Sequence, residues 1–277
     1  MKKLFKQLKQ WNRQRVADRR QRKMDDLFNN DFNRDSLTIE ALSQINLRKV
    51  STSSKPKSHV AVYSTYFGSN QSLTFNKQFV DPNFDHYFIS NNLSLLQNVE
   101  KLGWMPIHIS LPISRNRILS AQQSKIPKAL PHIFEELNQY QYVFYKDDKI
   151  DFDTSLLPSL IKKMESENAA LSIRLHPDLT SNVLNEFAVA MHQHRYEAQR
   201  GQMVEYISKK VAEGYSLKVD HMFWTSAILR NLKHPDTITI NEDWYQNILD
   251  CGIECQLSFD FVAQKYGCII EMPQNIS

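Results

Sequence analysis

Two adjacent carboxylates, Asp147 and Asp148, follow directly on a short run of aromatic and β-branched residues, 142–145. That run has no glycine or proline and predicts a buried strand. The carboxyl ends of strands in open α/β sheets border the ligand crevice. Carboxylates held there suit a hard divalent cation, Mn or Mg, shared with a diphosphate. The pattern favours sugar transfer from a nucleotide-sugar donor; the plain alternative is a strand followed by a polar turn.

A cationic segment precedes that strand. Residues 114–137 predict a helical stretch interrupted by prolines, and it carries Lys125, Lys128 and His132. These side chains are candidates for binding the donor phosphates, and the alternative is a helix surface that faces water. Glycine-rich phosphate loops are absent from the sequence, because its glycines lack the required spacing.

The first predicted strand, 59–68, offers a second group of donor contacts. Tyr63 and Thr65 lie toward its end, where they would contact the base or ribose. Gly68 follows them and would let the backbone approach a ligand closely. Core packing is the alternative for Tyr63.

A general base must remove the proton of the acceptor hydroxyl. Asp243 is the best-placed carboxylate by chain order, with Glu242 and Asp220 as rivals. Whether the anomeric configuration is retained or inverted does not follow from spacing.

Three further residues complete the predicted site. Gln256 is a catalytic-site candidate that would hydrogen-bond the sugar hydroxyls. Trp244 would stack on a sugar ring, or fill the core. His221 would be a third metal ligand, or a structural histidine.

The elements that would position these residues alternate between strands and helices. Strands are predicted over 59–68, 85–91, 103–110, 142–145 and 169–175. Pro106 suggests an edge position for the third of them. Such alternation predicts an α/β fold with a mainly parallel sheet. The later segments predict a helix capped by Thr154, a long polar helix over 185–212 and a closing amphipathic helix over 256–266.

The two ends of the chain differ in charge. Residues 1–23 hold ten Lys or Arg and one acid, so of the total charge of +4 they carry +9 and the remainder −5. We expect residues 1–58 to form a basic helical arm and linker, and residues 59–277 to form the folded domain. A basic helix over 1–32 suits an anionic membrane surface. A solvated arm or a helix packed on a partner is the alternative, and no nucleic-acid partner is expected.

Composition places the chain among globular proteins. Its three cysteines, Cys251, Cys255 and Cys268, are too few for a disulfide framework and favour a reducing compartment. No apolar run approaches the about 20 residues of a membrane span, and no signal peptide is evident. We expect a cytoplasmic protein, peripheral on the inner face of the plasma membrane.

Short motifs in a fixed order resemble those of one family. They are 124–132, Tyr142–Asp147, His176-Pro177, Gly214, Trp244 and 256–259, together with Tyr63 and Gly68. The order and spacing are similar to the glycosyltransferase-like domain of plant mucilage and turgor proteins and of bacterial capsule-type proteins. The resemblance covers about 60–266. It implies a GT-A-like fold, a Rossmann-type mixed sheet flanked by helices, and an enzyme that extends a surface glycan.

The departures from the family pattern fall at the site. Asp148 and Lys149 stand where the family has glycine and a small polar residue after the first aspartate. Cys255 stands where it often has an aspartate, and His176-Pro177 lacks the following arginine, with Leu179 near that position. These changes leave open a catalytically impaired protein that binds a glycan or partner. A lipid amide hydrolase is the lesser alternative, since the chain has no Gly-x-Ser-x-Gly motif.

Overall fold

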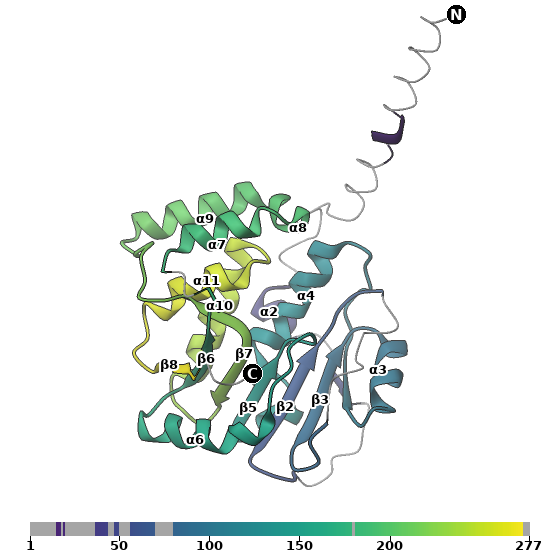
Figure 1. Cartoon of the computed structure of the whole chain (residues 1–277). Helices are drawn as coiled ribbons and strands as arrows, with labels where there is room; N and C mark the ends of the chain where they lie inside the picture. The colour runs from purple at the N-terminus through teal and green to yellow at the C-terminus, as the bar shows by residue number, and fades with distance from the viewer. Residues whose placement is uncertain are drawn as a thin grey trace, which may run out of the picture.

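The computed structural model describes residues 15–17, 19, 37–43, 47–49, 56–69, 80–178 and 181–273 (Figure 1). The predicted basic helix over 1–32 lies outside these residues, apart from 15–17 and 19. Leu179 also lies outside them. No helix of the described part is long and apolar enough to cross a membrane.

One mixed sheet organises the fold, in the order β1-β4-β3-β2-β5-β7-β6-β8. Its strands are β1 (Leu47–Lys49), β2 (Val60–Thr65), β3 (Asp85–Ser90), β4 (Met105–Ile109), β5 (Tyr142–Lys146), β6 (Leu171–Leu175), β7 (Phe223–Asn231) and β8 (Ile269–Met272). The pairs β2–β3, β3–β4, β2–β5 and β6–β8 are parallel, whereas β1–β4, β5–β7 and β6–β7 are antiparallel. The α/β class with a mixed sheet is therefore confirmed.

Helices cover both faces of this sheet. They are α2 (Ile39–Leu42), α3 (Leu93–Glu100), α4 (Arg117–Ala129), α5 (Glu135–Asn138), α6 (Leu157–Ser166), α7 (Val183–Ala190), α8 (His194–Glu197), α9 (Arg200–Ala212), α10 (Thr237–Cys251) and α11 (Cys255–Ala263), with 3-10 turns at Pro131–Ile133 and Thr154–Leu156. Alternate residues of the central strands point to opposite faces. Val62 and Phe144 pack with α6 on one face, and Tyr63 and Tyr145 face the larger core under α4 and α10 on the other.

A third layer lies at one end of the sheet. Figure 1 shows α7, α8 and α9 stacked there beside α11, beyond the main helical layer. Tyr206 of α9 and Phe261 of α11 belong to a separate apolar cluster that joins this layer to the body. The layer therefore forms a wall beside the strand ends.

Strand order reverses between β2 and β5. From β2 the sheet runs through β3 and β4 to one side, and the chain then returns to place β5 on the other side of β2. At such a switch point the strand ends diverge and leave a crevice. β2 ends there at Thr65, and Asp147 follows directly on the last residue of β5.

Two segments before residue 59 pack against the sheet. Leu37 and Leu42 are buried in the main core, and β1 pairs with β4. Residues 37–43 and 47–49 thus contribute to the sheet and its core although their sequence pattern is weak. The same pairing removes β4 from the sheet edge, so Pro106 does not mark an edge strand.

Candidate active site at the ends of two parallel strands

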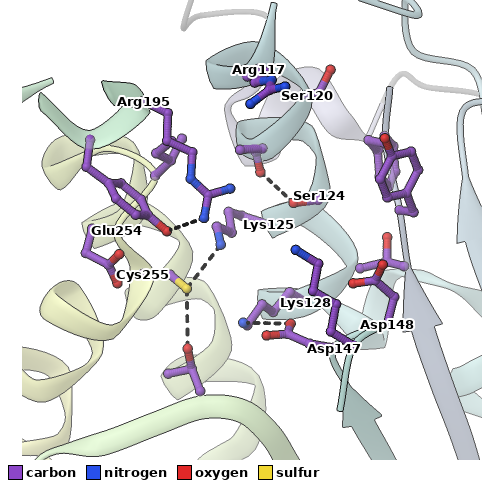
Figure 2. Close-up of a pocket in the computed structure, with 18 of the residues that line it drawn as sticks. Arg117, Ser120, Ser124, Lys125, Lys128, Asp147, Asp148, Arg195, Glu254 and Cys255 are labelled. Carbon is purple, nitrogen blue, oxygen red and sulfur yellow. Dashed lines mark hydrogen bonds and ion pairs between the residues drawn. The ribbon is translucent and has the colours of Figure 1, made fainter. Parts of the chain in front are cut away.

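A pocket of about 1010 Å³ opens at the switch point (Figure 2). One side is formed by the segments that follow β2 and β5, and another by α4. The opposite wall comes from α7, α8 and the start of α11. Among the described residues, the pocket is lined by six cationic side chains, namely Arg115, Arg117, Lys125, Lys128, Lys149 and Arg195, and by four acidic ones, namely Asp147, Asp148, Glu186 and Glu254.

The acidic pair is fixed by β5 and its neighbours. The backbone N–H of Asp147 donates to the Ser226 carbonyl of β7 at 2.8 Å, which anchors the residue after the strand ends. Its Oδ1 accepts from Lys128 Nζ at 3.2 Å and from the hydroxyl of Tyr145. Burial raises the pKa of Asp148, and the negative charge of Asp147 raises it further. Two carboxylates that repel each other in a pocket favour a bound cation.

Lys128 forms an ion pair with Asp147. Its side chain is 5% exposed and lies over the Tyr145 ring, with Nζ 5.1 Å from the centroid. Burial is the largest single influence on the pKa of Lys128 and lowers it, but the charge and hydrogen bond of Asp147, together with Cys255 and Glu254, raise it, so the net shift is upward. The ammonium therefore stays charged and neutralises part of the acidic pair.

A second cationic group surrounds Cys255. Lys125 Nζ donates to Cys255 Sγ at 3.2 Å, and the Thr225 hydroxyl lies 3.3 Å from the same sulfur. Arg195 Nη2 donates to the Tyr196 hydroxyl at 2.9 Å. Figure 2 shows that Arg195 and Lys125 both point into the pocket, with Arg117 on the same helix as Lys125. This side suits an anionic group such as a diphosphate.

The wall from α7 and α11 has a different chemistry. Glu186 Oε1 accepts from Gln256 Nε2 at 2.9 Å, and Oε2 lies 3.3 Å from His176 Nε2. Glu254 caps α11 by accepting from the Gln256 N–H at 3.1 Å. Burial, followed by the charge of Glu254, raises the pKa of Glu186 to about 7. Burial lowers the pKa of His176.

The structure brings most of the predicted residues together. The pocket lining includes Thr65, Gly68, Lys125, Lys128, Asp147, Asp148 and Gln256. The Thr65 hydroxyl donates to the Ile89 carbonyl at 3.0 Å, which leaves its oxygen as an acceptor. Gly68 has φ +135°, a conformation that favours glycine. Their roles in donor and metal binding remain predictions.

Three predicted donor residues lie elsewhere. Tyr63 is fully buried beneath the pocket, and its hydroxyl accepts from Arg230 Nη1 at 3.2 Å. Trp244 is also fully buried, and its Nε1 donates to the Cys255 carbonyl at 3.1 Å. His132 lies with Nε2 3.6 Å from Glu242 Oε1, outside the pocket lining. For Tyr63 and Trp244 the core alternative is therefore the correct one.

The predicted base and third ligand are also placed away from the pocket. Asp243 accepts from Lys265 at 2.8 Å and from the Tyr266 hydroxyl at 3.2 Å, on the outer side of α10. His221 Nε2 lies 2.5 Å from Glu271 Oε1 on β8. Within the described residues, Asp147, Asp148 and His221 do not gather their ligand atoms within 4.8 Å of one another. Chain order placed these residues near the site, but each is turned toward a neighbouring charged residue.

Two residues of the α7–α8 wall, Glu186 and Arg195, were not among the predicted site residues. The region 185–212 was predicted as one polar helix, whereas α7, α8 and α9 are separate and α7 turns Glu186 inward. No glycine or proline marks the breaks between them. The sequence signal nearest to this wall is the His176-Pro177 motif after β6, because the His176 side chain contacts Glu186.

The acidic pair fits one divalent cation through its carboxylate oxygens. Asp147 and Asp148 supply hard oxygen ligands, and a diphosphate and water would complete the shell. A second cluster, His234, Asp236 and Cys268, also holds three potential ligand atoms within 4.8 Å. It follows the end of β7 that pairs with the start of β5, so it lies at the far end of the sheet from the pocket.

No family model matches the sequence, and no curated protein matches it. Solved structures of glycosyltransferases align with most of the chain. Mouse xyloside xylosyltransferase 1 in its apo form covers 77% of this chain and 84% of its own, at 10% identity and a TM-score of 0.39. Core-mannan synthase A from Aspergillus fumigatus, with Mn and GDP, covers 80% and 74%, at 10% identity and 0.43. The mannosyltransferase Ktr4p from S. cerevisiae covers 90% and 82%, at 11% identity and 0.39. These scores are too low to carry a function.

Proposed function

We propose that the protein is a glycosyltransferase that moves a sugar from a nucleotide-sugar donor to a glycan acceptor, assisted by Mn or Mg. The observation that carries the proposal is the meeting of two features in one pocket. An acidic pair lies at the switch point of the sheet, and the cations of α4 face it. A donor diphosphate needs both, because a cation and basic side chains share its charge.

The chemistry places demands on individual residues. The anomeric C–O bond breaks and the nucleoside diphosphate leaves with the electron pair, so charge develops on the leaving oxygen. Lys128 and Lys125 lie along one face of α4 and would stabilise that charge. A divalent cation held by Asp147 and Asp148 would supply Lewis-acid stabilisation when bound. The segment around Gly68 allows the backbone to approach the nucleotide.

The acceptor and the location belong to the same proposal. A surface glycan of the capsule or lipopolysaccharide type, or a lipid-linked precursor of it, would be extended at this pocket. The basic residues of 1–32 would hold the enzyme on the inner face of the plasma membrane, where such acceptors are presented.

A second candidate, a protein that binds the donor without turnover, has one specific observation behind it. Lys128 Nζ already occupies Asp147 Oδ1 at 3.2 Å. A lysine that neutralises the proposed metal-binding carboxylate would support phosphate binding but lower the affinity for the divalent cation. Release of nucleoside diphosphate from the donor separates the two candidates, since only the enzyme produces it.

The lipid amide hydrolase has less support. Ser69, Ser114, Ser120 and Ser124 line the pocket, but no histidine does among its described lining residues. A serine nucleophile would need such a base within hydrogen-bonding distance.

Calorimetry with Mn and a panel of nucleoside diphosphates tests the proposal. We expect one of UDP, GDP, ADP or CDP to bind in a metal-dependent way, and Asp147→Asn to weaken it at least about tenfold. Asp151→Asn is the matched control, because Asp151 lies four residues away and outside the pocket lining. If neither metal nor any nucleotide binds to the native chain, the glycosyltransferase function is wrong.

A further inference from the structure

The pocket is divided by charge. The side formed by α4 and the end of β5 carries most of the cations, whereas the side formed by α7 and the start of α11 carries Glu186 and Glu254. Both glutamates are buried, at 7% and 5% exposure. Carboxylates there would repel a phosphate. The donor diphosphate therefore belongs to the α4 side, and the other side is left for a ligand of different chemistry.

Both carboxylate oxygens of Glu186 contact a polar side chain, and each oxygen can still accept a further hydrogen bond. Gln256 Nε2 donates to Oε1 at 2.9 Å, and His176 Nε2 lies 3.3 Å from Oε2. His176 Nδ1 accepts from the Asp178 N–H at 3.2 Å, so the imidazole proton is assigned to Nε2, which lies beside Glu186 Oε2. A carboxylate has about four lone-pair sites, and two remain for ligand hydroxyls. The carboxylate is thus oriented before a ligand arrives.

We propose that this wall is the acceptor subsite and that it binds an uncharged sugar. The sugar hydroxyls would donate hydrogen bonds to the Glu186 carboxylate and form hydrogen bonds with the Gln256 amide. The inference rests on the proposed glycosyl transfer and adds the chemical class of its acceptor. Fixed carboxylate and amide groups are suited to hydroxyl recognition, because each hydroxyl needs a partner when it leaves water. A uronic acid or a phosphorylated sugar would meet two buried glutamates.

The affinity for the acceptor should depend on the protonation state of Glu186. The titratable groups around it are His176 and Asp178 beyond β6, Glu254 before α11 and Asp260 within α11. Burial and then the charge of Glu254 raise the pKa of Glu186 to about 7. Hydroxyl donors favour the ionised form, so binding tightens as the pH rises through that value. A single group of this pKa gives about a tenfold gain in affinity between about pH 6 and about pH 8.

Saturation-transfer NMR of the full chain tests the subsite. The probes are methyl glycosides of glucose, galactose, mannose and N-acetylglucosamine, with the methyl glycoside of glucuronic acid for comparison. Mg replaces paramagnetic Mn, and the nucleoside diphosphate found by calorimetry is present. We expect at least one neutral glycoside to bind more tightly than the glucuronide, with the tenfold pH effect described above.

Variants assign the effect to Glu186. Glu186→Gln should abolish the pH dependence while binding persists, and Glu186→Ala should weaken binding about tenfold. Glu197→Gln is the control, because Glu197 is an exposed glutamate of α8 outside the pocket lining. The inference is overturned if the glucuronide binds equally well, if no neutral glycoside binds, or if Glu186→Gln keeps the pH dependence. If the native chain binds no nucleotide in calorimetry, the glycosyltransferase function is overturned instead, independently of these sugar titrations.

Discussion

Two buried cations lie next to each other in this fold and are held in opposite ways. Arg230, on β7, is fully buried and donates from Nη2 to the Lys128 carbonyl at 2.7 Å. Its Nε donates to Asn241 Oδ1 at 2.8 Å, and its Nη1 to the Tyr63 hydroxyl at 3.2 Å. The Lys128 ammonium instead faces the carboxylate of Asp147 at the pocket wall.

The difference separates a structural charge from a functional one. In the described part of the chain, no carboxylate lies within 4.0 Å of Arg230, and burial lowers its pKa. Neutral dipoles on three elements satisfy it, so it fixes α4 against β2 and α10. Lys128 shares its carboxylate with the pocket, where a ligand can take over either partner. Arg230 therefore supports the wall that presents Lys128.

Arg230→Met should have the largest effect. The change would leave the Tyr63 hydroxyl, the Asn241 amide oxygen and the Lys128 carbonyl without their donor in the core. We expect the free energy of unfolding to fall by about 3–5 kcal/mol, as for a broken buried network. Urea denaturation followed by circular dichroism measures it.

Lys233→Met is the matched control, since Lys233 is an exposed cation three residues away. Its effect should stay within about 0.5 kcal/mol. A loss below about 1 kcal/mol for Arg230→Met would show that the buried guanidinium does not hold this region together.

Lys128→Met should have the opposite effect, with little change in stability and a large loss of ligand affinity. Asp147 is 37% exposed and can be hydrated when its partner is removed, so the free energy of unfolding should change by less than about 1 kcal/mol. Affinity for the nucleoside diphosphate with Mg should fall about tenfold to a hundredfold, because a phosphate contact is lost. Calorimetry and urea denaturation of the same sample give both quantities. A stability loss equal to that of Arg230→Met would make Lys128 a second structural cation.

Sequence patterns predicted the half of the site that is built locally. The strand before Asp147 and the cationic helix with Lys125 and Lys128 each carry their signal within about a dozen residues. The acidic pair at a strand's carboxyl end predicted the ligand crevice, whereas the order of the strands was seen only in the structure. These features depend on propensity and period, which a single sequence shows.

The other half depends on contacts between distant segments. Arg230 on β7 donates to the Tyr63 hydroxyl on β2 and to the Lys128 carbonyl on α4. The sequence around Tyr63 gives no indication that a guanidinium contacts it. α7 buries Glu186 and ends at Ala190, where no glycine or proline in the sequence marks the break. Tyr63 was therefore predicted to bind a ligand although it packs in the core, and Glu186 was not predicted at all.

Asp243→Asn should have the smallest effect and extends the comparison to an exposed pair. Asp243 and Lys265 lie 2.8 Å apart with side chains 21% and 32% exposed, so water and salt screen their attraction. We expect a loss of less than about 1 kcal/mol in the free energy of unfolding, and a still smaller loss at high salt. Nucleotide affinity and the rate of nucleoside diphosphate release should match those of the native chain, because Asp243 lies outside the pocket. A collapse of turnover with intact nucleotide binding would restore Asp243 as the general base and require α10 to move toward the pocket during the reaction.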